Sequence, residues 1–106
     1  MSIASLNGEL LVGHESNGII RIKNKIVTQT VSNICPTQAW INSILIYKNQ
    51  YILHSCHSDK RVSILNLNLS STGRYLSTSG KPQGIHLDEE RLIVATFDPS
   101  GLDVFI

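Results

Sequence analysis

Short segments with strand-like character recur at nearly constant spacing along this chain of 106 residues. Displacing the sequence by 42 positions places SNGIIRIKN (16–24) on SDKRVSILN (58–66) without a gap. Displacing it by 40 places ILHSCHSDKRVSIL (52–65) on LIVATFDPSGLDVF (92–105). Apolar side chains then coincide at alternate positions, as strands with one buried side require. The coincident sets are Leu11, Leu53 and Ile93; Ile20, Val62 and Leu102; and Ile22, Ile64 and Val104.

Strand-like runs dominate the sequence, and helical periodicity is hard to find in it. The expected strands are 10–12, 19–22, 25–31, 41–47, 51–55, 61–67, 92–96 and 102–105, separated by turns at 16–18, 49–50, 58–60, 79–82 and 98–101. A period of about 40 residues with four short strands per unit is typical of a β-propeller blade. We therefore predict an all-β fold, a β-propeller fragment of about two and a half four-stranded blades. Residues 1–106 form one segment with units at 3–31, 41–79 and 85–106, the last lacking its fourth strand.

The apolar positions of this register predict which side chains form the core. Val62, Ile64 and Leu102 are expected to be buried, whereas Ser63 and Asp103 are not. A propeller needs at least four blades to close a ring. We therefore expect either self-association or docking onto another chain that supplies the missing blades.

The charged residues, the cysteines and the first residues of the chain indicate which partners and which cellular compartment to expect. Nine basic and eight acidic residues are scattered singly, so neither nucleic acid nor a membrane surface is an expected partner. Two cysteines, Cys35 and Cys56, do not make a disulfide framework, and the start MSIASLNGELL lacks the charged and apolar regions of a secretion signal. The expectation is a cytoplasmic protein, with a nuclear location as the alternative, and free thiols.

The middle unit resembles the WD-repeat family at two of its four signature positions. Ser55 matches the serine of the family's second strand, and Asp59 matches its turn aspartate, so both are expected to hold a structural turn. The family's Trp falls at Leu65, and its Gly-His pair falls at Pro36 and Thr37. The Trp-Asp dipeptide occurs nowhere in the sequence. The resemblance therefore implies a degenerate repeat whose hydrogen-bonded network forms only in part.

Within that family, the segment 53–69 is similar to blades of the actin-interacting protein 1 type, which act with cofilin. The shared features are the Ser-Cys pair, the turn Asp59, the pair Asn66-Leu67 and the later Pro82. This resemblance implies a regulator of the actin cytoskeleton with actin or cofilin as its partner. It supplies no specific actin-contact residue.

His54, Cys56 and His57 form the one Cys/His cluster that is continuous in the sequence. His54 and Cys56 share a strand face, as a metal site could use, but zinc sites take four ligands. The other candidates, Cys35 and His86, lie at equivalent places in no repeat. We expect no metal and no cofactor, with Cys56 a small buried apolar residue and His57 the start of a surface turn.

Ser55, His57 and Asp59 are the residue types of a catalytic triad, but they diverge on adjacent strand and turn positions. No catalytic residue is expected. The favoured function is a non-catalytic protein–protein interaction module that presents propeller loops within a larger ring or complex. The alternatives are the actin-cytoskeleton regulator and a propeller enzyme such as a lactonase or hydrolase.

Loop residues gathered on one rim of the repeat are the candidate contacts with a protein partner. Trp40 ends the polar loop NICPTQA (33–39), where it either packs between blades or anchors an interface, since Trp is enriched in interface hot spots. The predicted partner-binding residues are Trp40, His57, Lys60, Lys81 and Phe97.

Overall fold

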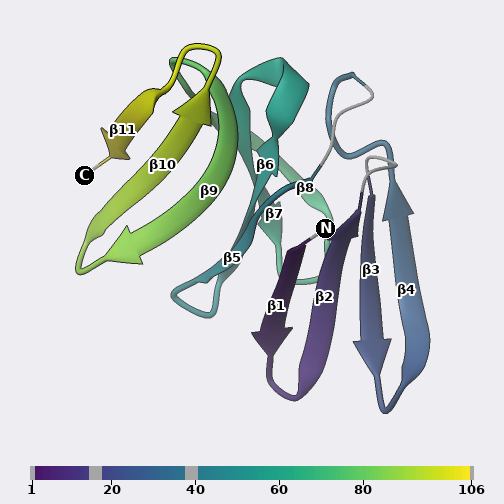
Figure 1. Ribbon diagram of the computed structural model, residues 1–106. Coiled ribbons are helices and arrows are strands. Elements are labelled where there is room, and N and C mark those ends of the chain that lie inside the picture. Colours follow the sequence, from purple (N-terminus) through teal and green to yellow (C-terminus); the bar gives the residue numbers. More distant parts are fainter. Residues whose placement is uncertain (1, 15–17, 38–40, 106) are drawn as a thin grey trace.

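Three antiparallel sheets stand side by side in the computed structural model, which describes residues 2–14, 18–37 and 41–105 (Figure 1). Eleven strands and one 3-10 turn make up the regular structure of these residues, and no α-helix occurs among them. Two sheets have four strands and the third has three. The predicted fold class, an all-β propeller fragment of about two and a half blades, is confirmed.

Each sheet is one blade, with its strands in chain order across the sheet. The first blade contains β1 (Ser2–Leu6), β2 (Glu9–His14), β3 (Gly18–Lys23) and β4 (Ile26–Ser32). The second blade contains β5 (Ile44–Tyr47), β6 (Tyr51–Cys56), β7 (Arg61–Asn66) and β8 (Ser71–Ser77), with the 3-10 turn η1 (His57–Asp59) between β6 and β7. The third blade contains β9 (Lys81–Asp88), β10 (Arg91–Phe97) and β11 (Gly101–Phe105).

Three strands differ from the sequence expectation. β1 and β8 lie outside the expected apolar runs, and β9 begins at Lys81, inside the expected turn 79–82. β8 is an edge strand of its sheet, and most of its residues are exposed, so it forms without an apolar run. Backbone pairing with β7 holds β8 in the sheet, although few of its side chains are buried.

The second blade is buried on both faces because it lies between the other two. Along β6, Ile52 and Cys56 join an apolar cluster with the first blade, and Leu53 joins a second cluster with the third blade. All residues of β6 after Tyr51 are buried. We call the face that a blade turns toward the next blade in the chain its forward face, and the opposite face its backward face.

The displacement of 40 between the second and third units is confirmed by strand register. Leu53 pairs with Ile64 in the second blade as Ile93 pairs with Val104 in the third. The displacement of 42 holds for β2 and β6 but is wrong by one residue beyond them. Val62 pairs with Ser55, and its counterpart opposite Gly13 is Ile19, not Ile20. The reason is that η1 and Lys60 make the β6–β7 connection one residue longer than the β2–β3 connection.

The burial expectations are confirmed for Val62 and wrong for Leu102. Val62 is fully buried and Ile64 partly so, whereas Leu102 is 69% exposed. Leu102 lies on the forward face of the third blade, which no described residue covers. Ser63 and Asp103, expected outside the core, are half-buried. Both lie on backward faces that a preceding blade covers.

Candidate functional site

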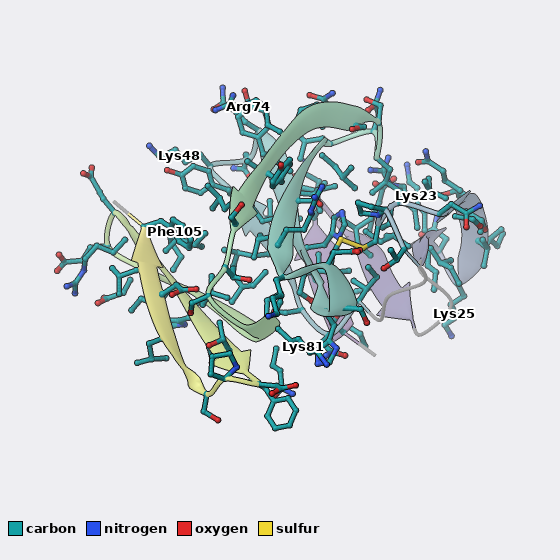
Figure 2. All side chains as sticks on the ribbon, turned by 90° about the horizontal axis from the view of Figure 1, so that it is seen from above. Lys23, Lys25, Lys48, Arg74, Lys81 and Phe105 are labelled. Carbon is teal, nitrogen blue, oxygen red and sulfur yellow. A yellow bond between two sulfur atoms is a disulfide. The ribbon has the colours of Figure 1, made fainter. Side chains whose placement is uncertain are left out.

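Four of the five predicted partner-binding residues lie on one rim of the blades. His57 begins η1, Lys60 follows it, and η1 contacts β9, which Lys81 begins. Phe97 lies opposite Lys81 in the pairing of β10 with β9. Figure 1 shows these two strands side by side, and Figure 2 labels Lys81. The fifth residue, Trp40, lies outside the described residues. We call His57, Lys60, Lys81 and Phe97 the rim cluster.

The rim cluster combines positive charge with an exposed aromatic ring. Phe97 is 51% exposed, and Lys60 is exposed in a left-handed backbone conformation. The Nζ atom of Lys81 lies 3.6 Å from the carboxylate of Asp98. Burial, and then the charge of Lys81, lower the pKa of His57 below its ordinary value. The rim cluster therefore holds its positive charge on lysines rather than on histidine at neutral pH.

Ser55 and Asp59, the two residues matched to the WD-repeat signature, fix the chain that enters the second blade. The buried Ser55 hydroxyl accepts hydrogen bonds from the backbone N–H groups of Asn42 and Ser43, each at 3.0 Å. Asp59 accepts the hydroxyl of Thr37 at 2.7 Å and its backbone N–H at 3.3 Å. Thr37 lies at the position where the WD-repeat resemblance places a His, and its short side chain reaches the carboxylate of Asp59. Both side chains are directed at the segment that precedes β5.

Apolar side chains are exposed on the two outer faces of the described structure. On the forward face of the third blade, Leu102 and Val104 are 69% and 53% exposed, beside Phe97. On the backward face of the first blade, Ile3 and Leu10 are 63% and 43% exposed. We call these surfaces the forward outer face and the backward outer face. Isolated exposed apolar residues are ordinary, but contiguous ones mark interaction surfaces.

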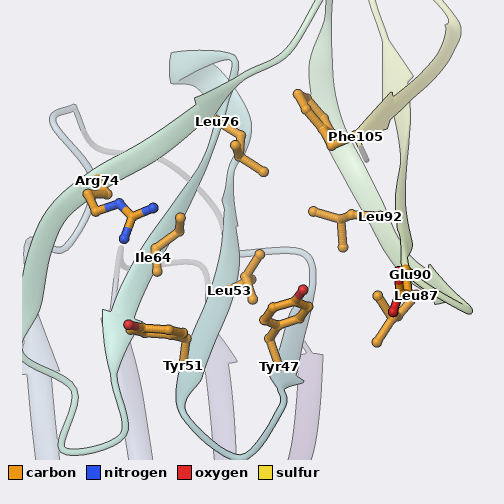
Figure 3. A pocket seen from close by; sticks show the side chains of 10 residues that line it. All are labelled: Tyr47, Tyr51, Leu53, Ile64, Arg74, Leu76, Leu87, Glu90, Leu92 and Phe105. Carbon is orange, nitrogen blue, oxygen red and sulfur yellow. The ribbon is translucent and has the colours of Figure 1, made fainter.

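A cavity of about 310 Å³ lies between the second blade and the third, at the end of these blades opposite the rim cluster. Its walls are mostly apolar side chains from both blades, with Arg74 and Glu90 as the charged members (Figure 3). The lining residues are Tyr47, Tyr51, Leu53, Ile64, Arg74, Leu76, Leu87, Glu90, Leu92 and Phe105. No local pattern in the sequence predicts this cavity, because it forms between residues of two blades that are distant in the chain.

A disulfide joins Cys35 to Cys56, so the expectation of free thiols is wrong. The loop after β4 brings Cys35 against the end of β6, with 5.7 Å between the two Cα atoms. Both cysteines are buried, as is His54. Cys35 therefore joins His54 and Cys56 although no repeat register relates it to them, because a loop places it there.

His54 is an unusual polar residue in this core. Its Nδ1 atom lies 3.7 Å from Cys56 Sγ, and its Nε2 atom is buried with no hydrogen-bond partner among the described residues. Burial lowers the pKa of His54 to about 4, against a smaller raising effect of a backbone hydrogen bond with Ser55. The imidazole is therefore neutral at neutral pH.

Comparison with known proteins defines the class by fold. No family model matches the sequence, and no curated protein is similar to it. Among solved structures, the chain is similar to Raptor from Chaetomium thermophilum, with a TM-score of 0.74 and 13% identity over 99% of this chain and 11% of that one. It is similar to virginiamycin B lyase from Staphylococcus aureus, with a TM-score of 0.66 and 12% identity over 98% of this chain and 40% of that one. It is also similar to the computationally designed Ika4 protein, with a TM-score of 0.60 and 8% identity over 98% of this chain and 88% of that one.

These likenesses show the fold alone, and the first two neighbours are propeller-type folds. The chain is therefore a propeller-type all-β protein. It spans less than half the length of those two neighbours. Among the described residues, no helix is long and apolar enough to cross a membrane.

Proposed function

We propose that this chain is a non-catalytic protein–protein interaction module that docks a propeller-type blade on each of its outer faces. One observation carries the proposal: the forward outer face exposes the residues that the same register buries one blade earlier. Leu102 pairs with Ala95 as Val62 pairs with Ser55. Val62 is fully buried and Leu102 is 69% exposed. The difference is the third blade, which covers Val62 and has no described counterpart over Leu102.

The occupant of these faces follows from the two interfaces inside the molecule. The forward face of the first blade packs on the backward face of the second, and the second packs on the third in the same way. The uncovered forward outer face therefore has the apolar character and register that fit the uncovered backward outer face of another copy. The proposed occupant is a second copy of this chain, in a head-to-tail contact that closes into a ring if the rotation allows it.

The proposal extends to Ser55, Asp59 and the rim cluster. We assign Ser55 and Asp59 to holding the loop at the rim, as in a degenerate WD-type blade. Trp40, His57, Lys60, Lys81 and Phe97 are the proposed contacts with a further protein partner. Actin or cofilin stay candidate partners from the sequence resemblance, and the cytoplasmic location stays a prediction.

Light scattering across a tenfold dilution tests the head-to-tail contact. The wild-type chain is expected to form a species of at least twice 11.7 kDa at the higher concentration. Leu102→Asp on the forward outer face and Leu10→Asp on the backward outer face should each give a smaller species. Ser100→Asp, in the exposed turn before β11, is the matched control and should behave as wild type.

A mixture of the two variants distinguishes a head-to-tail contact from a symmetric one. Each variant keeps one intact face, so the equimolar mixture should form a heterodimer through the remaining complementary pair. A symmetric contact would leave one of the single variants dimeric by itself. A wild-type chain that stays at 11.7 kDa throughout, with cooperative unfolding, would contradict the proposal.

The likeness to virginiamycin B lyase is the observation that favours a catalytic alternative. Retention of actin together with cofilin in a low-stringency pull-down would instead favour the cytoskeletal alternative. If the purified chain hydrolysed a lactone or an ester, the protein would be an enzyme and the proposal of a non-catalytic interaction module would be wrong.

A further inference from the structure

The geometry points to a second state of the buried Cys35, His54 and Cys56 cluster, in which the reduced cysteines and the imidazole bind one zinc ion. The ligand atoms of the three residues lie within 4.8 Å of one another, and all three side chains are buried. Tetrahedral zinc with bonds of about 2.3 Å to sulfur and about 2 Å to nitrogen holds its ligands at similar separations. Cutting the disulfide frees the two sulfurs to move apart within the same pocket.

His54 supplies the independent observation that favours a ligand. A buried ring nitrogen without a partner is rare, because an unmade hydrogen bond in the core is costly. Here the Nε2 atom is unpartnered among the described residues, while Nδ1 faces Cys56 Sγ at 3.7 Å. Zinc would be bound through the lone pair of Nδ1, the nitrogen that faces Cys56 Sγ, and the imidazole proton would then be on Nε2.

Charge balance favours zinc over a singly charged metal ion in this position. Two thiolates and a neutral imidazole cancel the charge of Zn²⁺, so the complex is uncharged. A buried site tolerates an uncharged complex because a net charge in the core is expensive. A singly charged ion held by two thiolates would leave one negative charge buried.

A second cavity next to Cys35 offers both a place for the fourth zinc ligand and a path by which the ion could enter. This cavity, of about 320 Å³, is lined by Cys35, Ser63 and Arg61 among other residues. The hydroxyl of Ser63 lies 3.5 Å from Cys56 Sγ. A water in this cavity or the Ser63 hydroxyl could complete a four-ligand set of two Cys, one His and one oxygen. Arg61 pairs with Cys56 across the strands, and its guanidinium lies over the Tyr75 ring, 3.8 Å from the ring centre.

The chemistry of the change balances with a thiol of low molecular weight as reductant. Two such thiols transfer two electrons and two protons to the disulfide, giving two cysteine thiols and one small-molecule disulfide. Zinc binding then releases the two thiol protons to solvent, since thiolates are the ligands. The disulfide and the zinc complex are therefore alternative states of the same cysteines.

Cobalt and zinc titrations of the reduced and oxidised chain test this inference. A phosphine reduces the disulfide, becoming its oxide with one water, and is removed by gel filtration without oxygen. The reduced chain should bind one Co²⁺ with the near-ultraviolet absorption of thiolate-to-cobalt charge transfer, and one Zn²⁺ should displace it. The oxidised chain should show neither signal. This comparison needs no substitution.

Variants separate the three ligands from nonspecific binding. Cys56→Ser should abolish the charge-transfer absorption. His54→Gln should weaken zinc binding by about tenfold or more, as loss of a zinc ligand or its support does. His86→Gln is the control, because His86 is an exposed histidine on β9, and it should bind as wild type.

Two results would overturn the zinc site. The first is a reduced wild-type chain that binds no zinc or cobalt, whether it stays folded or not. The second is His54→Gln that binds both metals as tightly as wild type, because the two thiols alone would then account for binding.

Discussion

Thr37 and Asp59 join the loop before the second blade to its 3-10 turn by two hydrogen bonds. The Thr37 hydroxyl donates to Asp59 Oδ1 at 2.7 Å, and the Thr37 backbone N–H donates to Oδ2 at 3.3 Å. The same loop carries Cys35, so the carboxylate and the disulfide hold it at two points. A threonine thus makes this contact at the position where the WD-repeat resemblance places a histidine.

Asp59→Ala should release one of those two points. The expected loss is about 1 kcal/mol of unfolding free energy, the usual contribution of an intramolecular hydrogen bond. Denaturant unfolding measures this loss, and amide hydrogen exchange should show lower protection at Thr37. Ser58→Ala, an exposed neighbour in η1, is the control. Equal protection of Thr37 in both variants would mean that the carboxylate does not hold the loop.

Gly13→Ala should destabilise the contact between the first blade and the second. A Cβ atom at Gly13 would lie 2.5 Å from Ile41 Cγ2 and 2.9 Å from Ser2 Oγ. Overpacking of this kind costs about 1 to 3 kcal/mol. Gly84→Ala is the matched control, because its Cβ would have its nearest neighbour at 3.9 Å. Chemical denaturation should show a lower unfolding midpoint for Gly13→Ala and an unchanged one for Gly84→Ala. Equal midpoints for the two variants would mean that Gly13 is not in close contact with Ile41 and Ser2.

Val62→Asp should unfold the chain, whereas Leu102→Asp should leave it folded. The two residues occupy equivalent register positions, but Val62 is fully buried and Leu102 is 69% exposed. An unpaired charge in the core costs several kcal/mol, a large part of a stability of about 5 to 15 kcal/mol. Circular dichroism and thermal melting would check both outcomes. A folded Val62→Asp variant would contradict the packing of the second blade on the third.

The oxidised chain should lose stability on acidification through His54. Burial lowers the pKa of this residue to about 4, from 6.5 for an unperturbed histidine. The unfolded chain therefore binds more protons between these values, so the stabilisation is complete above pH 6.5 and is lost as the pH falls toward 4. The difference amounts to about 3 kcal/mol of unfolding free energy. The cross-strand neighbours Ile44 and Ser63 carry no charge.

Urea unfolding of His54→Gln at several pH values measures that contribution. The variant should show a shallower fall in stability below pH 6.5 than wild type does. His86→Gln should keep the wild-type slope, since His86 is exposed. Parallel profiles for wild type and His54→Gln would mean that His54 is not the residue that titrates.

The repeat register predicted the blades because the signal it uses is local. Leu53 and Ile93, or Ile64 and Val104, alternate with polar residues within single strands, and the alternation survives in the paired sheets. β8 could not be predicted in this way, because its residues are mostly exposed and carry no apolar period. The displacement of 42 residues aligned Ile20 with Val62, whereas the true counterpart of Val62 is Ile19. The reason is that the 3-10 turn adds one residue to the second blade, and no apolar pattern marks that residue.

Only the tertiary structure decided which faces are covered and which distant residues meet. Leu102 and Val62 have equivalent surroundings in the sequence, and the presence or absence of a neighbouring blade separates them. Cys35 reaches Cys56 and His54 through a loop, 21 residues away along the chain from its disulfide partner. Alternation along a strand reports which side chains share a face, but burial and side-chain chemistry depend on what packs against that face from elsewhere in the chain.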